Sequence, residues 1–123
     1  MSRTILTVDD STSMRQMVRA TLQSAGYGVV EAADGQEALE FARGKAVDLV
    51  ISDVNMPRMD GIRLVHELRA LPNYRLTPLL LLTTESSQEK KLEGKRAGAT
   101  GWIVKPFNPT QLIATLTRLF GSA

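Results

Sequence analysis

Apolar residues along the chain form two alternating kinds of segment. Short continuous apolar runs bounded by Gly, Pro or acidic residues are typical of β-strands. Apolar residues spaced three or four positions apart are typical of amphipathic helices. The pattern predicts strands at about residues 5–8, 29–32, 48–53, 79–82 and 101–104. A helix is expected after each strand, at about residues 11–25, 34–44, 60–70, 86–97 and 108–120.

Polar residues mark where these helices are expected to begin. Asp34 and Ser86 each stand three positions before a Glu, which is the spacing of a capping box. Asn108 is followed by a Pro at the first helical position and a Gln at the third, the strongest helix start in the chain. Ser11, with the two hydroxyl residues after it, offers N-cap candidates for the first helix.

The predicted elements differ in how deeply they should be buried. The four leucines at 79–82 form a continuous apolar run, as expected of a strand buried on both faces. The strand at 29–32 contains Glu31 and is expected at an edge of the sheet. The helix at 86–97 contains Gly94 and few apolar residues besides Leu92. Because Gly is unfavourable inside a helix, we expect this helix to be the least stable.

The first and last helices should each bury one apolar face against the sheet. The expected inward residues are Met14, Met17, Val18, Thr21 and Leu22 in the first helix, and Leu112, Ile113, Leu116, Leu119 and Phe120 in the last.

Strictly alternating strands and helices imply an α/β fold with a parallel sheet and helices on both faces. The carboxyl ends of parallel strands share one edge of the sheet, where the sites of such folds lie. Four of the predicted strands end there on polar side chains: Asp9 and Asp10, Asp53, Thr83 and Lys105. The chain therefore predicts a chemically active edge.

Three carboxylates that converge would repel one another unless a cation neutralised them. One Lys is the only protein cation expected beside them, so a divalent ion is the economical completion. Oxygen-only ligation favours Mg²⁺, which bridges readily to phosphate oxygens. A Lys and a Thr hydroxyl beside such an ion suit a phosphoryl group. An Asp carboxylate can be the nucleophile, forming an aspartyl phosphate.

Each of these residues also has a purely structural interpretation. Asp9 or Asp10 alone could cap the first helix. Asp53 alone could be a turn residue, Thr83 a strand-end hydroxyl and Lys105 a solvated charge. These separate roles do not require one shared edge, so the set as a whole favours function.

The composition limits the class of protein and the kinds of site that the chain can form. The 123 residues suit one domain, and 43% hydrophobic with 23% charged residues is typical of globular proteins. The absence of Cys excludes disulfides and thiol chemistry, in keeping with a cytoplasmic location. The net charge of +2 indicates no nucleic-acid binding, and no stretch is long and apolar enough for a signal peptide or membrane span. His66, expected on an exposed helix face, is the only His, so imidazole metal sites and Ser-His pairs are excluded.

The chain resembles the receiver domain of two-component response regulators. The residues that carry the resemblance are Asp9-Asp10, Asp53, Thr83, Lys105-Pro106 and the loop 56–61, MPRMDG. They match in order and spacing over essentially the whole chain. Within that family, the chain is most similar to CheY-like single-domain chemotaxis regulators.

The resemblance implies a flavodoxin-like sheet of order 2-1-3-4-5 and one receiver domain over residues 1–123 with no output domain. It implies that Asp53 accepts a phosphoryl group from a histidine kinase. Mg²⁺ would bind Asp10, Asp53 and the backbone carbonyl of Asn55, with Asp9 acting through water. Lys105, in a cis peptide bond to its Pro, would pair with the phosphoryl group.

The resemblance also implies how the phosphorylated state is read and how long it lasts. Thr83 would bond the phosphate and report to an aromatic residue on the fifth strand. That residue is Trp102 here, where family members more often carry Tyr or Phe. From the residues alone, Trp102 is equally well a partly buried aromatic at the end of the sheet. Asn55 and Glu85 would tune the phosphate lifetime.

The implied partners are a chemotaxis-type histidine kinase and a downstream target, such as a flagellar motor switch protein or a phosphatase. The target would dock on the fourth helix, fifth strand and fifth helix of a monomer. A receiver that serves as a phosphate sink or relay in another pathway is the alternative, and an adaptor that never binds phosphate stays possible in principle.

A metal-dependent phosphatase is less favoured, because such enzymes commonly carry a second Asp two residues after the nucleophile, where this chain has Asn55. An amide cannot take a proton from water, so a phosphorylated state should persist. Asp9-Asp10 would repel the phosphate of FMN, which argues against a flavodoxin.

Overall fold

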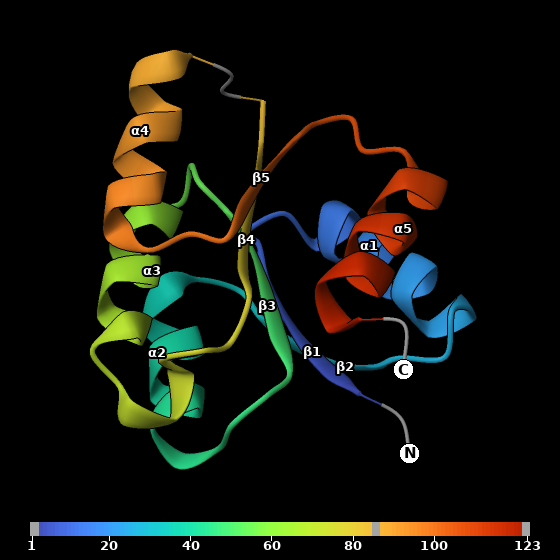
Figure 1. The fold of residues 1–123 in the computed structure, drawn as a ribbon, viewed down its shortest axis with the longest axis horizontal. Helices are drawn as coiled ribbons and strands as arrows, with labels where there is room; N and C mark the ends of the chain where they lie inside the picture. The colour runs from blue at the N-terminus through green and yellow to red at the C-terminus, as the bar shows by residue number, and fades with distance from the viewer. Residues whose placement is uncertain (1–2, 85–86, 122–123) are drawn as a thin grey trace.

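The computed structural model describes residues 3–84 and 87–121. Its five strands form one parallel sheet of order β2-β1-β3-β4-β5 (Figure 1). The strands are β1 (Thr4–Val8), β2 (Gly28–Ala32), β3 (Leu49–Asp53), β4 (Leu79–Thr83) and β5 (Gly101–Val104). The expected fold class and strand order are confirmed.

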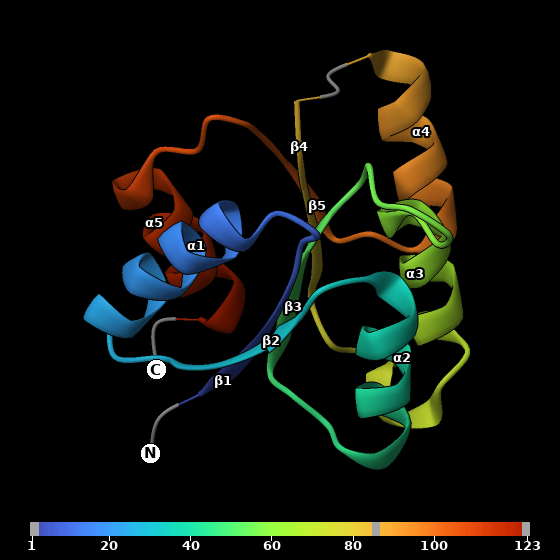
Figure 2. The same cartoon turned by 180° about the vertical axis from the view of Figure 1, so that it is seen from behind.

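Helices cover both faces of the sheet. One face carries α1 (Thr12–Ser24) and α5 (Pro109–Phe120), and the other carries α2 (Gly35–Gly44), α3 (Gly61–Arg69) and α4 (Gln88–Ala97) (Figures 1 and 2). A short 3-10 helix, η1 (Pro72–Tyr74), precedes β4. In the part of the chain that the structure describes, no helix is long and apolar enough to cross a membrane.

The core consists of two layers, one on each face of the sheet, because neighbouring strand residues point to opposite faces. In β3, Leu49 and Ile51 pack with α1 and α5, whereas Val50 packs with the layer under α2 and α3. All five residues of β4 are buried, as the leucine run predicts. β2 lies at an edge of the sheet, as its polar sequence predicts.

Most expected helix starts are found in the structure. The side chains of Ser11, Asp34 and Asn108 each accept a hydrogen bond from the N–H three residues later. The expected start of the fourth helix is wrong by one residue, because Ser87 is its N-cap and accepts from the N–H of Lys90. Ser86 itself lies outside the described residues.

The inward helix faces are narrower than the sequence pattern predicts. Val18 and Leu22 of α1, and Leu112 and Leu116 of α5, are buried. Met17 was expected to be buried but is 55% exposed. Met17 precedes the buried Val18 by one residue, which rotates its side chain about 100° around the helix axis and away from the buried face. The remaining expected residues of these two faces are only partly buried: Met14, Thr21, Ile113, Leu119 and Phe120.

Candidate functional site

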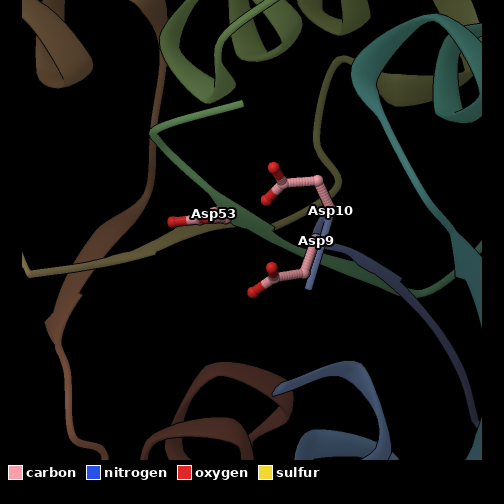
Figure 3. A group of neighbouring side chains, drawn as sticks. All are labelled: Asp9, Asp10 and Asp53. Carbon is pink, nitrogen blue, oxygen red and sulfur yellow. The ribbon is translucent and has the colours of Figure 1, made fainter. Parts of the chain in front are cut away.

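Three carboxylates meet at the carboxyl edge of the sheet. Asp53 is the last residue of β3, and Asp9 and Asp10 directly follow β1, its hydrogen-bonded neighbour. One carboxylate oxygen from each lies within 4.8 Å of the others, and the three side chains extend toward the same side in Figure 3. The strand register thus places together acids that are 44 positions apart in sequence.

The three acids differ in their contact with solvent. Asp9 and Asp53 are buried, at 3% and 7% exposure, whereas Asp10 is exposed. Burial raises the pKa of Asp53 above its ordinary value, and the negative charge of Asp9 raises it further. Lys105 opposes both effects through its charge and a hydrogen bond. A buried carboxylate in this position is therefore held close to a cation.

Lys105 supplies that cation from the far side of the site. Its Nζ lies 3.3 Å from Asp53 Oδ1 and 3.4 Å from Asp9 Oδ2, and its side chain is 14% exposed. Lys105 directly follows β5, and its N–H donates to the carbonyl of Thr83 at 2.8 Å. The peptide bond from Lys105 to Pro106 is cis, as the resemblance implies.

Thr83 and Asn55 complete the rim of the site. Thr83 ends β4 and is fully buried. Asn55, exposed in the loop after β3, donates from Nδ2 to Thr83 Oγ1 at 3.5 Å. This bond links the loop that follows Asp53 to the β4 hydroxyl. Glu85 lies outside the described residues.

Gly61 determines how closely α3 approaches Asp53. Its N–H donates to the carbonyl of Val54 at 2.8 Å, and a Cβ at this position would collide with the carbonyl of Asp53. Asp60 caps the helix by accepting from the N–H of Arg63 at 2.8 Å. The sequence pattern predicts a helix start here but not this contact, because the contact depends on how the loop folds back on β3.

Arg15 is a residue of the site that the sequence pattern does not identify. Its Nη1 donates to the carbonyl of Asp9 at 2.6 Å, and its Nε donates to Glu31 at 3.3 Å. Glu31 is also paired with Arg19 at 2.7 Å. Arg15 therefore links the main chain at Asp9 to Glu31 of β2. The only signal in the sequence is a basic residue one turn after the N-cap of α1.

Trp102 lies in β5, the edge strand of the sheet, and is partly buried. Its ring packs against α4 at Gly94, where an added Cβ would lie 3.0 Å from the ring atom Cζ3 and 3.0 Å from Leu81 Cδ1. Gly94 is therefore more than a weak point of its helix, because it leaves room for the indole.

The family comparison agrees with this geometry. Residues 5–117 match the model of the response regulator receiver domain. The chain belongs to the response regulator receiver domain family. Chemotaxis protein CheY-3 of Vibrio cholerae serotype O1 is 38% identical over 117 residues, which cover 94% of this chain and 90% of that protein.

Two solved structures extend the comparison. The Vibrio cholerae chemotaxis protein CheY4 is 56% identical, with a TM-score of 0.93 and coverage of 97% of this chain and 99% of that one. The receiver domain of sensor histidine kinase PA1611 from Pseudomonas aeruginosa is 31% identical, with a TM-score of 0.91 and coverage of 98% and 99%. That structure has a magnesium ion coordinated in its active site cleft. The three acids of the present chain, all hard oxygen donors, are compatible with the same ion.

Proposed function

We propose that this receiver domain accepts a phosphoryl group on Asp53 from a histidine kinase and signals through the resulting state. The observation that carries the proposal is the bridging position of the Lys105 ammonium between Asp53 and Asp9. A carboxylate that served only structure would gain nothing from a second buried acid beside it. In this proposal the domain is a signalling protein and not an enzyme that turns over a substrate.

The chemistry assigned to Asp53 is nucleophilic attack on phosphorus. An Asp53 carboxylate oxygen forms the new P–O bond, and the P–N bond of the kinase phosphohistidine breaks with its electron pair returning to the imidazole, which takes up a proton. Asp53 must be ionised to attack. Lys105 favours that ionised form against burial and the charge of Asp9, and its ammonium can then pair with the phosphoryl oxygens.

We assign the metal site to the same cluster. Asp10, Asp53 and the backbone carbonyl of Asn55 would hold Mg²⁺, with Asp9 acting through water. The fit rests on three carboxylate donors within 4.8 Å of one another, of which exposed Asp10 lies on the solvent side. When bound, Mg²⁺ supplies positive charge that offsets the acids and the incoming phosphoryl oxygens.

The signal is assigned to Thr83 and Trp102. Thr83 would bond a phosphoryl oxygen in place of its present contact with Asn55. The resulting change at the end of β4 would shift the ring of Trp102 relative to α4, against which it packs. The readout face is then α4, β5 and α5. Asn55, which cannot act as a base toward water, would with Glu85 set the lifetime of the phosphorylated state.

The similarity to chemotaxis proteins of Vibrio cholerae supports a chemotaxis pathway. The partners are then a chemotaxis-type kinase and a target such as a flagellar motor switch protein or a phosphatase. A phosphate sink or relay in another pathway is the alternative. A target that binds the phosphorylated form alone supports signalling, and transfer of the phosphate onward to another protein supports a relay.

The single Trp of the chain allows a direct test. With Mg²⁺ and a small phosphodonor, wild-type protein should change its Trp102 fluorescence and Asp53→Asn should not. Lys105→Ala should still accept phosphate, measured by intact mass, but show a weakened fluorescence change. If Asp53→Asn responds to the donor as wild type does, the assignment of the nucleophile is wrong. A flat wild-type signal despite phosphorylation would exclude Trp102 from the readout.

A further inference from the structure

A second surface lies at the opposite edge of the sheet from Asp53. An open groove of about 790 Å³ runs beneath the amino ends of the strands. Its walls come from the start of β1, the loop before β3, the loop from η1 to β4 and the end of α5. Its lining includes Arg3, Asp48, Arg75, Leu76 and Phe120. The proposed phosphoacceptor function does not use this surface.

Leu76 is the most exposed large apolar side chain of the described residues, at 95% exposure. A single exposed Leu is ordinary on a protein surface. This one stands on the wall of the groove, which is also lined by the partly buried Leu119 and Phe120. An apolar side chain entering the groove would therefore meet apolar contacts on both walls.

The loop that carries Leu76 is fixed by hydrogen bonds. Arg69, at the end of α3, donates from Nη1 to the carbonyls of Tyr74, Arg75 and Thr77 at 2.7, 3.2 and 2.8 Å. The Tyr74 ring is fully buried, and its hydroxyl donates to the carbonyl of Lys45 at 2.7 Å. Leu76 thus projects from an anchored loop, which lowers the entropy cost of using it as a contact.

The charges around the groove favour an acidic partner. Arg3 and Arg75 are exposed, and within residues 3–84 and 87–121 neither guanidinium pairs with a carboxylate. Arg3 instead lies over the Phe120 ring, 4.2 Å from its centroid. Asp48 is the only acid among the described residues of the lining, and its Oδ2 already accepts from the N–H of Thr4 at 2.7 Å. Two guanidinium groups are left to meet incoming carboxylates.

We propose that this groove docks a short acidic segment of a partner protein, whose apolar side chain packs between Leu76 and Phe120 while its carboxylates meet Arg3 and Arg75. The groove is open along its length, which suits an extended peptide better than an enclosed small molecule. Two cations beside one acid are too few for a nucleic-acid backbone.

The docking surface is physically separate from the phosphoacceptor edge. The two lie at opposite ends of five-residue strands, a span of about 16 Å at ~3.3 Å per residue. A partner bound in the groove leaves Asp53 and the α4–β5–α5 face uncovered. The groove can therefore tether the receiver to a partner in either phosphorylation state.

The test is a titration of ¹⁵N-labelled full-length protein with a synthetic peptide that carries one Leu between Glu residues. Amide shifts should concentrate at Arg3, Asp48 and residues 74–77. Leu76→Ser and Arg75→Glu should each weaken binding about tenfold, because they remove the apolar contact or reverse a charge. The matched controls on α4, Leu92→Ser and Arg96→Glu, should bind as wild type does. Asp53→Asn should also bind normally, which separates this test from that of the proposed function.

A peptide with Lys in place of Glu should give no groove shifts. Equal binding of the two peptides, shifts confined to the α4–β5–α5 face, or normal binding by Leu76→Ser would each overturn the proposal. Groove shifts that depend on protein concentration without peptide would assign the surface to a second copy of the chain and also overturn it.

Discussion

Replacing Arg69 by Met should destabilise the fold substantially while leaving the phosphoacceptor edge intact. The side chain of Arg69 joins three parts of the chain: the end of α3, the loop from η1 to β4, and the turn between α4 and β5. It donates to the carbonyl of Gly98 at 3.0 Å and to Thr100 Oγ1 at 3.3 Å, in addition to the carbonyls of the loop. Burial lowers the pKa of Arg69, as expected of a partly desolvated cation.

The loss of unfolding free energy follows from the carbonyl oxygens that would no longer have a hydrogen-bond donor. The carbonyls of Tyr74, Thr77 and Gly98 are part-buried acceptors that would lose their charged donor. At the low end of the range for such losses, ~1 kcal/mol each, the variant should lose about 3 kcal/mol of unfolding free energy. With an unfolding entropy of ~2.1 cal/mol/K per residue, this lowers the Tm by about 10 °C. A typical domain stability of ~5–15 kcal/mol leaves the variant folded.

Urea denaturation and thermal unfolding measure this loss, and Arg63→Met is the matched control. Arg63 lies on the same helix, but its side chain is 66% exposed and, among the residues that the structure describes, pairs only with Glu67, so its removal should change the Tm little. Arg69→Lys should fall between the two, because an ammonium cannot reach several carbonyls at once. Equal Tm values for Arg69→Met and Arg63→Met would refute this reasoning.

Three further variants test other parts of the structure. Burial raises the pKa of Asp53, so protonation of this carboxyl stabilises the fold fully below the ordinary carboxyl pKa, and the contribution is lost as pH rises through the raised pKa. Because Asn resembles the protonated acid, Asp53→Asn should be more stable than wild type at neutral pH without Mg²⁺ and lose this advantage toward pH 4 and below. Denaturation curves across pH check the sign. Gly94→Ala should displace the Trp102 ring and change its fluorescence in the unphosphorylated protein, whereas Ala at exposed Gly44, with no atom near its Cβ position, should not. Gly61→Ala should cost ~1–3 kcal/mol or more, because the methyl would overlap the carbonyl of Asp53, and a Mg²⁺ titration should show weakened binding.

The sequence was sufficient to predict the fold, because its apolar runs, its polar strand and its helix caps all indicate the same arrangement of elements. The leucine run at 79–82, the polar edge strand and the helix caps at Asp34 and Asn108 all report local preferences that the tertiary structure keeps. The convergence of Asp9, Asp10, Asp53 and Lys105 was predictable for the same reason: parallel strands bring their carboxyl ends to one edge.

The features that the sequence could not predict depend on contacts between distant segments. Met17 is apolar yet exposed, because its position around the helix relative to Val18 decides its burial. The contact of Arg15 with the Asp9 carbonyl requires the exact placement of α1, and the space that Gly94 leaves for Trp102 requires that of α4. The sequence carries one weak sign of the first contact, a basic residue one turn after the N-cap of α1, and none of the second.

Chemical trapping of the phosphorylated residue tests the proposed role of Asp53 most directly. Wild-type protein treated with a small phosphodonor and Mg²⁺ can be reduced with borohydride, which converts an aspartyl phosphate to homoserine and leaves free carboxylates unchanged. Peptide mass spectrometry should then find homoserine at position 53, and only in samples that contained Mg²⁺. Homoserine at position 9 or 10, or none at any position in protein that has gained a phosphoryl group, would contradict the assignment.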